Sequence, residues 1–151
     1  MASAGTAILG GFTYLLIRKI VNNNKFADLM LFIQEGQAQE KGEIGYLKAF
    51  DIKWYDTPDP QKRAIIKYTT AKVNELVDKL YKASTRLMTD ENTIYSIYNS
   101  MESMKKMAQV AKAFGIKYGI SLLDRLTNAL DKSEKKKLFA IIATKPDVQF
   151  A

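Results

Sequence analysis

The hydrophobic residues between positions 60 and 146 recur at the spacing of α-helices, with polar residues between them. In residues 60–84 this pattern predicts one long helix, which Asp59 caps and Pro60 begins. Four shorter segments with the same spacing follow. Their predicted buried residues are Ile94, Ile97 and Tyr98; Met104, Met107, Ala108, Ala111 and Phe114; Leu122, Leu123, Leu126 and Leu130; and Leu138, Ile141 and Ile142. The pattern therefore predicts an all-α domain of five helices within residues 60–151.

The ends of these helices carry recognisable signals. Thr89 is the predicted N-cap of the second helix, and Ser133 that of the fifth, which Pro146 ends. Gly115 and Gly119 are expected to bracket a turn after the third helix. The methionine stripe of that third helix is typical of an adaptable binding groove, but core filling is the more usual explanation.

The segment before this domain has a different pattern. Residues 36–47 are mostly polar and indicate a loop or a weak helix. In the stretch that follows, Phe50, Ile52 and Trp54 alternate with polar residues or tyrosine, a period of two that is typical of extended chain. We therefore predict that residues 36–59 form a loop followed by an extended arm, which packs its aromatic face on a neighbour. Docking to another chain is the alternative interpretation.

The N-terminal residues 1–35 are predicted to form two apolar helices. From Ala2 to Ile17 there are 16 consecutive uncharged residues, slightly fewer than the roughly 17–25 of a spanning helix. Positive charges follow this stretch instead of preceding it, so no cleavable signal peptide is expected. A short membrane anchor, a helix buried in an assembly and an ordinary core helix all remain open. The predicted attachment residues are Ile8, Leu9, Phe12, Leu15, Leu16, Ile17, Arg18 and Lys19.

The amino-acid composition limits the kinds of catalytic and metal-binding sites that this protein can have. The 151 residues include no cysteine and no histidine, which excludes cysteine or histidine nucleophiles, redox switching and thiolate or imidazole metal ligands. Two pairs of carboxylates, Asp90 with Glu91 and Asp124 with Asp131, match in principle what glycoside hydrolysis needs. Each is explained more simply by helix-start charges or a solvated face. We therefore expect no catalytic residues, no metal site and no cofactor.

Charge is distributed unevenly along the chain. Residues 61–151 contain 17 Lys and Arg against 9 Asp and Glu, whereas residues 1–60 contain 6 against 7. The basic part favours acidic partners, such as lipid head groups, nucleic acid or an acidic protein surface. The clearest cluster is Lys135 to Lys137, for which a solvated helix start is the more usual explanation than nucleic-acid binding.

Five successive segments of residues 72–146 resemble a single annexin repeat. They are VNELVDKLYKAS, MTDENTIYSIYNSM, MKKMAQVAKAFGIKYG, LLDRLTNAL and KKKLFAIIATKP, and Thr89-Asp90-Glu91 is the most characteristic string. The resemblance covers about half of the chain and implies an annexin-like five-helix module. The segment also resembles isolated annexin-like repeats of bacterial and bacteriophage proteins. This resemblance favours a virion or membrane-associated structural role.

The calcium site that this resemblance implies is altered in three positions. Annexin repeats bind calcium through carbonyls of a glycine-containing loop and a distant acidic residue. The two loop glycine positions correspond here to Arg86 and Met88, and the acidic position corresponds to Ala129, with Asp131 the nearest carboxylate. Because calcium needs six to eight oxygen ligands, we do not expect it to bind here.

These observations lead to one expectation for the whole chain. An apolar N-terminal helix and an extended arm precede an annexin-like five-helix module in an all-α protein. We expect a non-enzymatic structural or interaction protein of a membrane or virion assembly, whose partners are other protein subunits and, through its N-terminus, lipid. The alternatives are a calcium-dependent phospholipid-binding module and a basic, nucleic-acid-binding helical protein.

Overall fold

The computed structural model describes residues 45–85 and 87–151, and within them the chain is α-helical, without any β-strand. The predicted attachment residues Ile8 to Lys19 lie outside the described residues. The described elements are the 3-10 helix η3 (Gly45–Phe50) and the α-helices α3 (Ile52–Tyr55), α4 (Thr70–Ala83), α5 (Glu91–Ser100), α6 (Met104–Tyr118), α7 (Leu122–Ala129) and α8 (Lys132–Ala143). The predicted all-α class is confirmed for this part of the chain.

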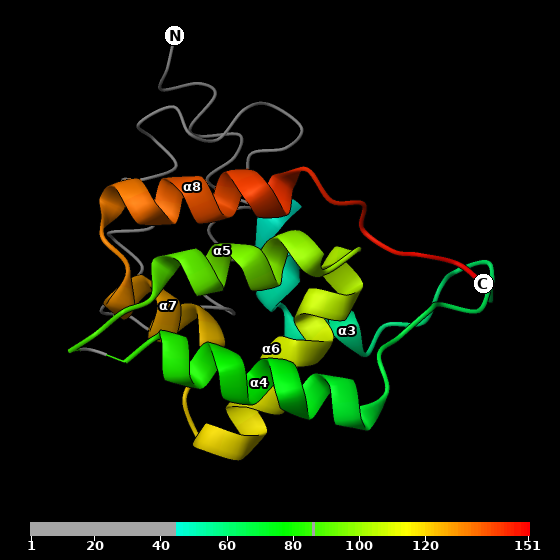
Figure 1. The fold of residues 1–151 in the computed structure, drawn as a ribbon. Helices are drawn as coiled ribbons and strands as arrows, with labels where there is room; N and C mark the ends of the chain where they lie inside the picture. Colours follow the sequence, from blue (N-terminus) through cyan, green and yellow to red (C-terminus); the bar gives the residue numbers. More distant parts are fainter. Residues whose placement is uncertain (1–44, 86) are drawn as a thin grey trace, which may run out of the picture.

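The helices pack around a single hydrophobic core. Helix α6 contacts η3, α3, α4 and α7, while α5 packs between α8 and α4 (Figure 1). Every predicted buried position of the last four helices is buried except Ile141, which is partly buried against the core. Each buried side chain of leucine size contributes roughly 1.5–3 kcal/mol through removal of apolar surface from water. Since Met104 and Met107 of α6 are buried, they fill the core and do not line a groove.

Local hydrogen bonds decide where the helices begin. Asp90, not Thr89, is the N-cap of α5, and its carboxylate accepts a hydrogen bond from the Thr93 amide. Asp131 replaces the predicted Ser133 as the N-cap of α8. It forms a capping box with Glu134, in which each carboxylate accepts from the other residue's backbone amide, at 2.8 and 2.7 Å. This reciprocal pair satisfies two amides at once, which a Ser133 cap cannot do.

Helix α6 is longer than predicted. It continues through Gly115 to Tyr118, whose ring stacks on Tyr81 of α4 at a centroid distance of 3.9 Å. Gly119 alone ends the helix, with a φ of 70° in the left-handed region where glycine is least strained. The predicted glycine-bracketed turn is therefore wrong at its first position, because the aromatic packing extends the helix beyond Gly115.

The prediction of a helix from Pro60 was wrong by ten residues, since α4 begins at Thr70 after a Thr69 cap. The backbone of residues 60–69 makes its hydrogen bonds elsewhere. Ile65 forms an isolated antiparallel bridge with Phe150, and the Tyr68 amide and carbonyl bond the side-chain amide of Gln109. Figure 1 shows the C-terminal segment lying beside this loop.

The prediction of extended chain at residues 50–54 was also wrong. Phe50 ends η3, and Asp51 caps the single turn of α3 by accepting a hydrogen bond from the Trp54 amide at 3.0 Å. Phe50 is buried between the rings of Tyr98 and Phe139, whereas Ile52 is exposed. The Asp51 cap and the burial of Phe50 in the aromatic core therefore decide the local structure, and the period-two pattern of residues 50–55 does not.

Candidate functional site

The hairpin between α4 and α5 contains the loop in which the annexin resemblance places a calcium site. Its base is closed by a bridge between Ser84 and Thr89, and by a 2.7 Å hydrogen bond from the Asp90 amide to the Ala83 carbonyl. The Thr89 hydroxyl shares its proton between the carbonyls of Thr85, at 3.0 Å, and Ala129, at 3.2 Å, and so links the loop to the end of α7. The hairpin is thus braced by its own backbone and by α7.

Two large apolar side chains at the tip of this hairpin are exposed. Leu87 is 97% exposed and Met88 is 81% exposed, while Arg86 lies outside the described residues. No group of three acidic side chains suited to a metal ion occurs in residues 45–85 or 87–151. The described helices also include none with the length and apolar character to span a bilayer.

The predicted carboxylate pairs have structural roles at helix starts. Asp90 bonds both the amide and the hydroxyl of Thr93, and these hydrogen bonds hold the pKa of Asp90 below its usual range. Asp131 belongs to the α8 capping box. Asp124 is buried in the first turn of α7, where a negative charge is favourable.

The lysine cluster lies in the first turns of α8. Lys136 and Lys137 are exposed, and the Lys137 ammonium lies 4.6 Å from the centroid of the Tyr95 ring.

A cleft that the sequence did not predict is formed by residues 55–67 and by Lys105 at the start of α6. Its volume is about 770 Å³. Pro58, Pro60 and Ile65 supply apolar lining, and charged side chains supply the remainder. The size is that of ordinary small-molecule sites.

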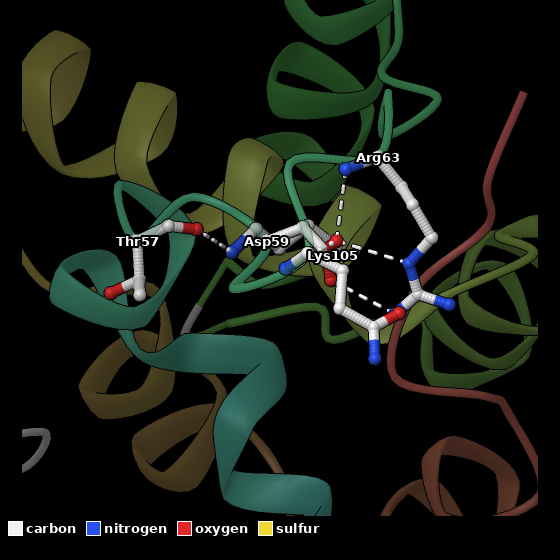
Figure 2. A network of polar contacts seen from close by, with 5 residues as sticks. Thr57, Asp59, Arg63 and Lys105 are labelled. Atoms are coloured by element: carbon white, nitrogen blue, oxygen red, sulfur yellow. Dashed lines mark hydrogen bonds and ion pairs between the residues drawn. The ribbon is translucent and has the colours of Figure 1, made fainter.

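One side of this cleft is held by a compact polar network around Asp59. Its carboxylate accepts hydrogen bonds from the Gln61 and Arg63 amides and from the Arg63 guanidinium (Figure 2). The hydrogen bonds from Arg63 lower the pKa of Asp59 from 3.8 to about 2. The same guanidinium lies 3.8 Å above the Phe150 ring, so the C-terminal segment braces the loop from outside.

Lys105 supports the other side of the cleft. Only 3% of this residue is exposed, and its ammonium donates to the carbonyl of Trp54, at 2.6 Å. The same ammonium donates to the carbonyl of Thr57, at 2.8 Å (Figure 2). It also lies 4.5 Å from the centroid of the Trp54 ring. Burial lowers the pKa of Lys105, and the positive charge of Lys67 lowers it further.

The positive charges of the cleft are only partly balanced. Asp59 pairs with Arg63, and Asp56 pairs with Lys112 at 2.7 Å. Lys62 and Lys67 have no carboxylate within ion-pair distance in the described part of the chain, although Lys67 lies 4.8 Å from the Tyr55 ring centroid. The cleft therefore has an excess of cationic groups around an apolar floor.

The sequence pattern predicted a helix over residues 60–84, which includes Lys62 and Lys67, and gave no indication of the cleft. The available signal was weak: two prolines beside Asp59, followed by basic residues interleaved with apolar ones. Burial of Lys105 had no signal of its own, because lysine is rarely buried.

No protein family model, no curated protein and no solved structure matches this chain.

Proposed function

We propose that this chain is a non-enzymatic structural or interaction protein with an annexin-like helical module, attached to a membrane or to the subunits of an assembly. The order of α4 to α8 supports the annexin-like comparison, because these helices fall on the five segments that resemble an annexin repeat. Attachment through the apolar residues Ile8 to Ile17 is part of the same proposal and rests on the sequence.

The observation that carries the proposal is the apolar hairpin tip. Two large side chains, Leu87 and Met88, are almost fully exposed on a braced base, although burying each would release roughly 1.5–3 kcal/mol. Contiguous exposed apolar surface usually marks contact with a partner or a membrane. The tip thus supplies a second apolar contact, besides the N-terminal residues.

Calcium is not required in this proposal. The carbonyl of Ala129 accepts the Thr89 hydroxyl, and the residue itself supplies no carboxylate at the position where the resemblance places the acidic ligand. Basic residues near the tip, such as Lys82 at the end of α4, favour an anionic surface instead.

Sedimentation with anionic vesicles tests the proposal, with calcium and with chelator. The full-length chain is compared with Leu15→Asp/Leu16→Asp and with Leu87→Ser/Met88→Ser. Ile116→Ser is the matched control, because Ile116 is also exposed but lies on α6, away from the tip. We expect calcium-independent pelleting that falls severalfold in both double variants and is unchanged in the control.

Two results would contradict this proposal. Pelleting that needs calcium would favour the calcium-dependent phospholipid-binding alternative. If both double variants pellet as well as the unaltered protein, the apolar residues at these two places are not needed for attachment.

A further inference from the structure

The cleft between residues 55–67 and Lys105 points to a function separate from attachment. We infer that it binds a small organic phosphate, with the phosphate between Lys67 and Lys105 and an apolar body against the two prolines and Ile65. The described residues of the hairpin tip, Leu87 and Met88, do not line this cleft.

The first argument is the state of the Lys105 ammonium. An ammonium has three N–H donors, and two of them bond the carbonyls of Trp54 and Thr57. No oxygen or nitrogen atom among the described residues accepts the third, and besides the two carbonyls the ammonium contacts the Trp54 ring, at 4.5 Å. Lys105 is almost fully buried and lines the cleft. A buried charged donor is costly unless it is paired, so an acceptor from a ligand completes this site.

The second argument is the charge of the walls. Lys62 and Lys67 line the same cleft and form no ion pair with a carboxylate of residues 45–85 or 87–151, and the two acidic side chains nearby are each bonded to another cation. A phosphate monoester carries a charge of about −1.5 to −2 near neutral pH and matches several cations better than a carboxylate does. Lysine is an ordinary phosphate ligand that acts as a point charge.

The third argument is that the cleft is already formed. Asp59 closes the loop through four hydrogen bonds, while Gln109 holds the Tyr68 backbone and Phe150 pairs with Ile65. A ligand therefore does not have to order this loop, which would otherwise reduce its affinity. The apolar lining from Pro58, Pro60 and Ile65 selects a phosphate that carries an organic group.

Trp54 makes the inference directly testable. It is the single tryptophan of the chain, and its ring lies beside the Lys105 ammonium. We would titrate the full-length protein with phenyl phosphate and follow tryptophan fluorescence at an excitation wavelength that phenyl phosphate does not absorb. Calorimetry with the same probe provides an independent signal. Inorganic phosphate and benzyl alcohol test the phosphate and the apolar body separately.

We expect saturable binding of phenyl phosphate that is tighter than that of either partial probe. Lys67→Ala should weaken it about tenfold, the usual effect of losing one charge-assisted hydrogen bond. Lys62→Ala should weaken it by a smaller factor. Lys136→Ala removes an equal charge from the exposed face of α8 and should leave the affinity unchanged. Helical circular dichroism of each variant checks that it is folded.

A short-chain phosphatidic acid, used below its micelle concentration, separates the two sources of such a phosphate. If phosphatidic acid displaces phenyl phosphate from the cleft, the natural ligand is a lipid head group. If it displaces phenyl phosphate much less effectively, the natural ligand is a soluble phosphate ester. The inference is overturned if phenyl phosphate gives no saturable signal. It is also overturned if Lys67→Ala and Lys136→Ala bind it equally well.

Discussion

The helical core and the loop that joins α3 to α4 are stabilised in different ways. The core is formed by η3 and by the apolar faces of α4 to α8, and large side chains in it, such as Phe114 and Leu126, are fully buried. The loop over residues 56–69 is mostly exposed and depends on polar contacts, chiefly those of Asp59 and Gln109. Stability of the whole domain and shape of the cleft should therefore respond to different substitutions.

The largest expected effect is in the core. Phe114→Ala should lower the free energy of unfolding by about 3–5 kcal/mol, because it removes a fully buried ring and leaves a cavity. Ile116→Ala on the same helix is the matched control, and should change stability by less than about 0.5 kcal/mol, since Ile116 is exposed. Urea unfolding followed by far-ultraviolet circular dichroism measures both. Equal losses in the two variants would contradict the packing described for α6.

A smaller change in stability is expected at Tyr98, a polar group within the core. The Tyr98 hydroxyl is buried without a hydrogen-bond partner in the described part of the chain, and burial raises the pKa of Tyr98. Tyr98→Phe should stabilise the protein by about 1 kcal/mol, because it removes an unsatisfied polar group and keeps the ring. Thermal unfolding tests this, and a lower melting temperature would show that the hydroxyl has a partner in solution.

A smaller effect is expected in the loop. Lys62 has a φ of 57°, in the left-handed region that a residue with a Cβ adopts at a cost. Lys62→Gly should stabilise the protein by about 0.5 kcal/mol while it weakens phenyl phosphate binding, because it relieves backbone strain and removes a charge. Lys62→Ala keeps the strain and should show only the weaker binding. Equal stabilities of Lys62→Gly and Lys62→Ala would mean that the backbone is not strained.

The most local effect concerns pH. The folded pKa of Asp59 is lowered from 3.8 to about 2, so its contribution to stability is complete above the unfolded value and is lost as the pH falls from 3.8 through 2. The Arg63 side-chain N–H resonance should therefore titrate with a midpoint of about 2 by NMR. Asp59→Asn should abolish this titration and leave the core helices unchanged. A midpoint near 3.8 would show that the pairing does not persist in solution.

The predictable parts of the fold are those in which local signals and burial agree. The stripes of α5 to α8 each combine helical spacing with polar caps, so their buried faces were predicted correctly, and errors were confined to boundaries such as Gly115. Residues 60–69 have similar spacing but are not helical. Their backbone groups bond Gln149, Gln109 and Ala151, which are 40 or more residues away, and no local pattern encodes such contacts.

The cleft was unpredictable for the same reason. Lys105 and Lys67 are far apart in sequence, and each alone is an ordinary surface residue type. Only the packing of α3 against the start of α6 brings the Lys105 ammonium to two carbonyls and buries it. The signal would have been a lysine on an otherwise apolar face, which the long alkyl chain of lysine makes ambiguous.

The amino-acid sequence by itself determined the all-α class, the core faces of the last four helices and the absence of cysteine and histidine chemistry. These properties follow from residue types and from a short-range period, which act within a few turns of chain. Tertiary structure alone decided where α4 begins, that Lys105 is buried and that Lys105 and residues 55–67 line one open cleft. Each depends on hydrogen bonds and packing between distant segments, whose free energy appears only once the core has formed.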